Sequence, residues 1–337
     1  MSLERQSLVL WVTGKCNLRC KYCYASEAPQ SDMDFETAAK AIDLMRGAPV
    51  TIQISGGEPL LNVTLIEKIF AYATERNIMD FAIQTNGTLI DDKTVELLKR
   101  YRVAIGVSLD GKPETNEYHR GGTNEVVDGI VLLREQSLML NLNCVVSDFN
   151  AGRLREMVDM AVYFGNVRGI GFDLLRNAGR AAESATQIAC ADAESLSEGL
   201  YALSDYLEKI NQILPEKIVV REFEKARIQY GKKMDSRDYC YAAVGKSYVV
   251  LPDGDCYVCG SLIGESKYYM GNVHGEVQPL SIECNIPADC AKCKHGEYCT
   301  GGCPARAITS GGFNELDCVV RKISFEIAEN SKRAKSF

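Results

Sequence analysis

Six short, strand-like apolar runs alternate with helical stretches over the first 180 residues, and this alternation limits the possible folds most strongly. Strands that alternate with helices form a parallel sheet, because each helix returns the chain to the start of the next strand. We therefore predict an α/β fold, a partial (β/α)6 barrel of the TIM type. The expected strands are residues 8–13, 51–55, 81–85, 104–109, 140–147 and 169–175.

Three cysteines follow the first expected strand at CxxxCxxC spacing: Cys16, Cys20 and Cys23. Thiolates are the usual ligands of iron–sulfur clusters, and a four-iron cluster normally takes four of them. A loop that supplies only three leaves one iron open to another ligand. A zinc loop is the alternative interpretation of closely spaced cysteines.

Other unusual motifs also fall at the carboxyl ends of expected strands, where barrel enzymes place their chemistry. After the second strand, Gly56 and Gly57 permit close backbone approach, and Glu58 can accept hydrogen bonds from an ammonium group. Asn86-Gly87 after the third strand indicates only a turn. At the end of the fourth strand, Asp110 is either a turn residue or part of a site.

The CxxxCxxC motif, with aromatic Tyr22 before its third cysteine, resembles that of radical S-adenosylmethionine (SAM) enzymes. The resemblance implies that Cys16, Cys20 and Cys23 are the catalytic cysteines, holding a [4Fe-4S] cluster whose open iron is chelated by SAM. It also implies a set of SAM-binding residues: Tyr22, Gly56, Gly57, Glu58, Ser108 and Arg120. Within that set, Glu58 would hold the amino group of SAM, and the planar guanidinium of Arg120 would pair with its carboxylate.

Seven cysteines in the second half follow the spacings Cx13Gx4C, Cx2Cx5Cx3C and a final single cysteine. Residues 252–255 indicate a hairpin turn that brings Cys259 near Cys240. This pattern resembles the SPASM extension of radical SAM enzymes, here a small Cys-rich α+β domain, and implies two auxiliary [4Fe-4S] clusters. The implied ligands are Cys240, Cys259 and Cys303 for the first, and Cys290, Cys293, Cys299 and Cys318 for the second. Taken alone, this half is also compatible with zinc.

Several cysteines and all three histidines lie outside these patterns. Cys256, Cys284, a substrate group or an open position can complete the first auxiliary cluster, and the spacing does not choose between them. We interpret Cys144 and Cys190 as buried thiols. The histidines His119, His274 and His295 share no metal or nucleophile motif and are interpreted as structural.

The length and net charge of the chain limit how many domains it can hold and which partners it can bind. A chain of 337 residues can hold a barrel (residues 1–190), a helical bridge (191–217) and a Cys-rich domain (218–337). The net charge of −7 argues against a nucleic-acid surface. No apolar run is long enough to cross a membrane and no signal peptide is evident, so we expect a cytoplasmic protein with reduced thiols.

The resemblance implies an oxidoreductase that cleaves SAM to a 5′-deoxyadenosyl radical and abstracts a hydrogen atom from its substrate. We expect the substrate to be a ribosomal peptide or a protein side chain, which is oxidised or cross-linked, with a flavodoxin- or ferredoxin-type electron donor. Sulfatase maturases place an aspartate after the cysteine that matches Cys259, where this chain has Gly260. The alternatives are a small-molecule radical SAM dehydrogenase, a haem- or quinone-pathway enzyme, and a non-catalytic iron–sulfur electron carrier.

Overall fold

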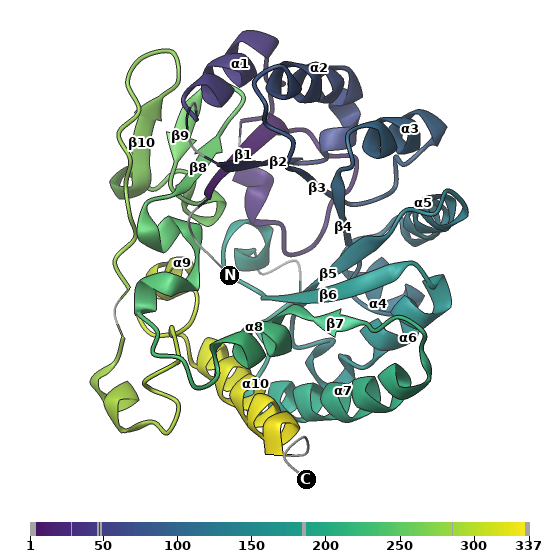
Figure 1. The fold of residues 1–337 in the computed structure, drawn as a ribbon, viewed down its shortest axis with the longest axis vertical. Coiled ribbons are helices and arrows are strands. Elements are labelled where there is room, and N and C mark those ends of the chain that lie inside the picture. Colours follow the sequence, from purple (N-terminus) through teal and green to yellow (C-terminus); the bar gives the residue numbers. More distant parts are fainter. Residues whose placement is uncertain are drawn as a thin grey trace.

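The computed structural model describes residues 5–27, 29–45, 47, 49–183, 187–284 and 286–333. Within these residues one curved ten-stranded sheet has the order β10-β9-β8-β1-β2-β3-β4-β5-β6-β7, and it does not close on itself (Figure 1). An open, mostly parallel sheet with helices on its outer face is the architecture of a partial barrel. The predicted fold class is therefore confirmed.

The six predicted strands are all present, and each pairs in parallel with its neighbour. Their bounds are β1 Gln6–Thr13, β2 Val50–Gly56, β3 Phe81–Thr85, β4 Ala104–Ser108, β5 Leu140–Val146 and β6 Val167–Leu174. In β1, Leu8, Leu10 and Val12 are fully buried in the main hydrophobic core. Strands of this kind read as apolar runs because both faces of the sheet are covered.

Helices connect these strands and lie outside the curve of the sheet (Figure 1). Their bounds are α1 Phe35–Asp43, α2 Val63–Thr74, α3 Asp92–Arg100, α4 Pro113–His119, α5 Thr123–Glu135 and α6 Glu156–Phe164. Asp34 accepts a hydrogen bond from the Thr37 amide at 2.7 Å and so satisfies one of the free donors at the start of α1.

A long helix, α7 (Ala193–Ile213), leaves the barrel. It begins behind the N-cap Asp192 and ends before Pro215, because the residue preceding a proline is pushed out of the helical region. The chain then forms the edge strand β7 (Val219–Val220) and helix α8 (Arg221–Gln229).

The C-terminal region continues the same sheet. Strand β8 (Ser247–Val250) pairs in parallel with β1 and antiparallel with β9 (Asp255–Tyr257), which confirms the predicted hairpin. Beyond β10 (Tyr269–Asn272) the chain is mostly irregular up to α9 (Pro304–Thr309) and α10 (Glu315–Arg333). The division into three domains remains a prediction, since one sheet runs through the proposed first and last parts.

None of the helices in the described residues is both long and apolar enough to cross a bilayer.

Short 3-10 helices complete the described part of the chain. The 3-10 helices are η1 Tyr24–Glu27, η2 Pro59–Asn62, η3 Ala151–Arg153, η4 Gly179–Ala182, η6 Ser236–Tyr239, η7 Tyr241–Val244, η8 Gly260–Leu262, η9 Ser266–Tyr268 and η10 Ala288–Lys292.

Candidate functional site

The loop that carries the first three cysteines rests on the Gly-Gly segment after β2. The Gly57 amide donates to the Thr13 carbonyl and the Glu58 amide donates to the Lys15 carbonyl, both at 2.9 Å. A Cβ atom on Gly57 would lie 2.3 Å from the Lys15 carbonyl oxygen, so only glycine permits this approach. The structure thus brings together two motifs that lie about 40 residues apart in the chain.

The three thiols of this loop converge. The pKa of Cys20 is raised to about 11, first by burial and also by the nearby charges of Cys23 and Cys16, while Arg120 lowers it. The Cys16 sulfur accepts a hydrogen bond from the Leu18 amide at 3.4 Å. No disulfide uses any of the chain's 14 cysteines. This donor set fits a cluster that takes three thiolates from one loop.

No group of three or more His, Cys, Asp or Glu side chains in the described part of the chain is arranged around a single metal ion. A four-iron cluster distributes its ligands over four metal atoms, so its thiolates stand farther apart than the ligands of one zinc ion.

Glu58 is fully buried beside the cysteine loop. Its carboxylate accepts hydrogen bonds from the amides of Leu60 (3.0 Å) and Asn86 (2.7 Å) and from the Thr85 hydroxyl (2.7 Å). Burial raises the pKa of Glu58, and these donors counteract that rise. A carboxylate has about four acceptor positions, so room for one more donor remains.

Asp110 is the centre of a buried network at the end of β4. Its carboxylate accepts two hydrogen bonds from Arg120, at 2.8 and 3.1 Å, one from the Val145 amide at 2.8 Å and one from the Tyr22 hydroxyl. The Nδ1 atom of His119 lies 3.3 Å away. Although burial alone would raise the pKa of Asp110, Arg120 and His119 lower it to about 2. Asp110 therefore holds Tyr22 and Arg120 in place.

Two further residues at strand ends belong to this neighbourhood. Ser108 accepts a hydrogen bond from the Gln84 side chain at 3.0 Å. Asn86, which the sequence indicated only as a turn residue, donates to Asn17 at 2.9 Å and to the Cys16 sulfur at 3.9 Å. The signal that sequence reasoning missed was the polar Asn86 side chain at a carboxyl strand end.

The seven C-terminal cysteines lie in two groups. The pKa of Cys240 is raised to about 11, chiefly by burial. The charges of Cys303 and Cys259 also contribute to this rise. Separately, the pKa of Cys318 is raised by burial and by three other thiols, those of Cys290, Cys299 and Cys293. These are the two ligand sets that the SPASM resemblance implies, and each set fits one cluster. Cys259 lies just beyond β9, not on it.

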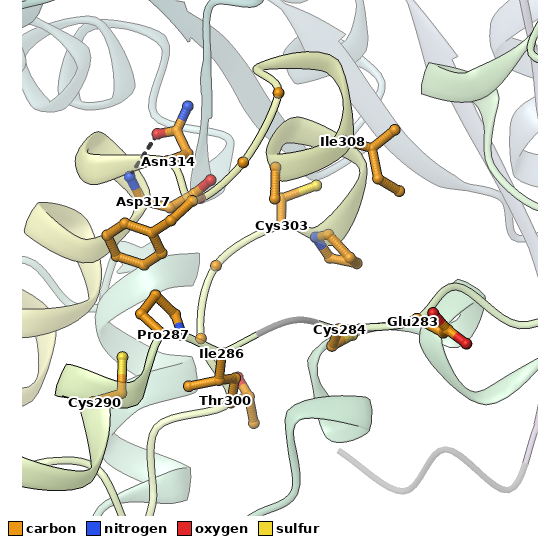
Figure 2. Close-up of a pocket in the computed structure, with 17 residues that line it drawn as sticks. Glu283, Cys284, Ile286, Pro287, Cys290, Thr300, Cys303, Ile308, Asn314 and Asp317 are labelled. Atoms are coloured by element: carbon orange, nitrogen blue, oxygen red, sulfur yellow. Dashed lines mark hydrogen bonds between the residues drawn. The ribbon is translucent and has the colours of Figure 1, made fainter.

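The structure separates the two candidates for the remaining ligand of the first set. Cys256 is fully buried in the main core. Cys284 and Cys303 both line a cavity of about 270 Å³, and Figure 2 shows them on two segments that face each other. The backbone supports this proximity, because the Ile282 amide donates to the Ala242 carbonyl at 3.0 Å, two residues from Cys284 and Cys240 respectively.

The two remaining cysteines differ. Cys144 is 1 % exposed, as predicted for a buried thiol. The prediction for Cys190 is wrong, because this residue is exposed and lies in an irregular segment before α7. No turn signal marks this segment other than Asp192, which caps the helix two residues later.

A cavity of about 970 Å³ connects the inner face of the barrel to the first C-terminal cysteine group. Polar side chains from the strands line one end, including Gln53, Gln84 and Asn143. Cys240 and Cys259 line the other end, together with Cys303. A cavity of this size is large enough for a substrate segment.

Comparisons with known proteins agree with this geometry. Residues 12–161 match the model of the radical SAM superfamily. An uncharacterized protein of Methanocaldococcus jannaschii is 34% identical over 283 residues, which cover 79% of this chain and 88% of that protein. The serine-type anaerobic sulfatase-maturating enzyme of Klebsiella aerogenes is 26% identical over 330 residues, 89% of this chain and 80% of that enzyme.

The fold is similar to that of native anSMEcpe with bound AdoMet and Kp18Cys peptide. The TM-score is 0.81 at 20% sequence identity, and the match covers 99% of this chain and 100% of that chain. Since the match spans both regions of the molecule, the C-terminal cysteine-rich part shares the fold as well as the barrel. The chain belongs to the radical SAM superfamily.

Proposed function

We propose that this protein is a radical SAM enzyme that oxidises or cross-links a side chain of a ribosomal peptide or protein. The observation on which the proposal depends is the cavity of about 970 Å³, which begins at the inner barrel face and ends at Cys240, Cys259 and Cys303. It provides space for substrate between the inner barrel face and an auxiliary cluster site. The matched anSMEcpe structure holds a peptide, and the K. aerogenes relative matures sulfatases.

In this proposal the cofactors are SAM and three [4Fe-4S] clusters. Cys16, Cys20 and Cys23 would hold the cluster that binds SAM, and the two C-terminal cysteine groups would hold the auxiliary clusters. When bound, the first cluster supplies the electron that cleaves SAM to a 5′-deoxyadenosyl radical. A flavodoxin- or ferredoxin-type protein would deliver that electron in the cytoplasm.

The residues of this chain bind, orient and exclude water. Glu58 would offer its remaining acceptor position to the amino group of SAM, and Ser108 would contact SAM from the end of β4. Arg120, oriented by its two hydrogen bonds to Asp110, would pair with the SAM carboxylate. Because Asp110 already fixes the guanidinium, little side-chain freedom is lost when SAM binds.

A second candidate is a small-molecule enzyme. The Fe-coproporphyrin III synthase of Methanosarcina barkeri is 33% identical, but over only 47% of this chain, 169 residues. The similarity to the sulfatase-maturating enzyme covers nearly twice that share. We therefore place the peptide substrate first.

The test is an anaerobic incubation of the reconstituted protein with SAM, dithionite and the short peptides encoded beside its gene. Mass spectrometry should show 5′-deoxyadenosine and a peptide that has lost two hydrogens. Formation of 5′-deoxyadenosine without any peptide change would reject the peptide substrate and favour a small molecule. Absence of 5′-deoxyadenosine from protein with full iron content would indicate an electron carrier.

A further inference from the structure

Five carboxylates line the large cavity, and four of them already have hydrogen-bond partners. Asp317 binds Arg306 at 2.7 and 2.9 Å, and Glu224 binds Arg227 at 2.5 and 2.7 Å. The other two partnered carboxylates are Glu222, which accepts from Arg221 and from the Phe172 amide, and Asp238, which accepts from the Asp235 amide. Each of these four groups is hydrogen-bonded within the fold, although the Oε2 atom of Glu222 is buried without a partner.

Asp173, at the carboxyl end of β6, is the exception. It accepts no hydrogen bond from the residues that the structure describes, and its side chain is 55% exposed towards the cavity. Its nearest cations are Arg306 Nη1 at 3.8 Å and Arg221 Nη2 at 3.9 Å, both beyond hydrogen-bond distance. Both arginines have closer partners, so the oxygens of Asp173 remain available to a ligand.

The surroundings place Asp173 between the two cysteine regions. Tyr24 follows Cys23 directly in the chain. Burial raises the pKa of its phenol, Arg176 lowers it, and the charges of Asp173, Cys259 and Cys23 raise it further. The guanidinium of Arg176 lies 5.3 Å from the Tyr24 ring centre. Its Nε atom is buried without a hydrogen-bond partner. A buried donor without a partner beside a free carboxylate indicates a place for a polar substrate group.

We propose that Asp173 is the catalytic base that removes a proton from the substrate after hydrogen-atom abstraction. This proposal rests on the proposed function and deepens it. Asp173 supplies a carboxylate to this cavity from the end of a barrel strand.

The step balances as follows for a substrate carbon bonded to an O–H, N–H or S–H group. The 5′-deoxyadenosyl radical takes one hydrogen atom from the carbon and becomes 5′-deoxyadenosine. The carbon radical then gives one electron to an iron–sulfur cluster of the C-terminal region. The proton of the O–H, N–H or S–H group passes to an oxygen of Asp173, and its bonding electrons complete a double bond to the carbon.

The charges around Asp173 suit this role. The cavity walls partly desolvate Asp173 and so raise its pKa, but the charges of Arg221, Arg306 and Arg176 bring it below the ordinary value. The carboxylate is therefore charged at neutral pH, so an acceptor oxygen is present before each turnover. The same three arginines offset the negative charge of Asp173 before the proton arrives.

The test compares Asp173→Asn with Glu224→Gln, a matched change at a cavity carboxylate that is already bonded to Arg227. Without a base, product formation in Asp173→Asn should fall about a hundredfold or more. The 5′-deoxyadenosine of the first turnover should be retained, and an organic radical signal should accumulate in electron paramagnetic resonance spectra. Glu224→Gln should behave as wild type, and Asp173→Glu should restore part of the rate.

Iron content, SAM affinity and peptide affinity of both variants are measured first and should equal those of wild type. Product formation at the wild-type rate by Asp173→Asn would overturn the proposal, and so would a loss of peptide affinity in place of radical accumulation. A wild-type protein that cleaves SAM but changes no peptide would reject the proposed substrate class instead. In that case the same variants are compared on porphyrin substrates. Asp173→Asn should again lose product formation, and Glu224→Gln should again behave as wild type.

Discussion

The cysteine loop of the barrel and the cysteine-bearing segments of the C-terminal region offer the same chemical groups but are held in different ways. Backbone hydrogen bonds attach residues 13–15 of the barrel to the Gly-Gly segment, and the Tyr22 hydroxyl binds buried Asp110. The segment between β10 and α9 contains four of the seven C-terminal cysteines. It has no strand among its described residues. Directly after this segment, the buried pair of Arg306 and Asp317 joins α9 to α10.

This difference indicates that the barrel site is preformed and that the C-terminal sites depend more on their clusters. A strand ladder and a buried network keep the barrel loop in place without any ligand. Metal binding can supply much of the folding free energy where little other structure exists. The predictions below test this contrast.

The largest effect should come from removing whole sets of cysteines. Replacement of Cys16, Cys20 and Cys23 with Ala should lower the iron content from about twelve to about eight and abolish SAM cleavage. The C-terminal part should keep its protection from hydrogen exchange. The matched change of Cys290, Cys293, Cys299 and Cys318 should remove as much iron but also expose residues 286–333. Equal loss of protection in both variants would break the contrast.

The sequence predicted the barrel well because periodic apolar runs determine strands and helices locally. All six strands and the hairpin turn at residues 252–255 depend on patterns within about ten residues. The Asp110 network could not be predicted in this way, since its partners Tyr22, Arg120 and Val145 meet only in the folded chain. The same holds for Asp173, whose importance follows from the partners that it lacks.

The buried pair should matter more than any surface pair in the C-terminal region. Arg306→Ala leaves Asp317 as an uncompensated buried charge, so unfolding of this region should become easier by about 3–5 kcal/mol. Arg227→Ala removes an exposed pair with Glu224 and should change stability by about 1 kcal/mol or less. Denaturant unfolding of both variants checks the difference. A small effect of Arg306→Ala would mean that clusters alone hold this region.

On the barrel side, Glu58 and Arg120 should contact the amino and carboxylate groups of SAM. Each charge-assisted contact contributes roughly 1.5–3 kcal/mol, so Glu58→Gln or Arg120→Ala should weaken SAM binding about tenfold or more. Equilibrium binding to the cluster-loaded protein measures this. Unchanged affinity in Arg120→Ala would assign the residue to the Asp110 network alone.

Acid should weaken the barrel network within a defined pH range. The pKa of Asp110 is lowered to about 2 in the folded chain, so its contribution is complete above the ordinary value near 4 and is lost as the pH falls towards 2. The loss should be roughly 2 kcal/mol for a shift of this size. Urea unfolding of wild type and Asp110→Asn between these pH values tests it, since only wild type should show this slope.

The smallest effect should appear at the fourth corner of the first auxiliary cluster. Cys284 lies on the segment that faces Cys303, whereas Cys256 is fully buried in the main core. Cys284→Ala should therefore leave the iron content unchanged. It should alter the electron paramagnetic resonance spectrum of this cluster and allow an added thiol to bind the iron that Cys284 held. Cys256→Ala should leave both unchanged. If wild type already binds the added thiol as readily as Cys284→Ala does, the position is open in the native protein. The first auxiliary site would then be a candidate binding site for a substrate cysteine, and a Cys284-ligated electron relay would be excluded.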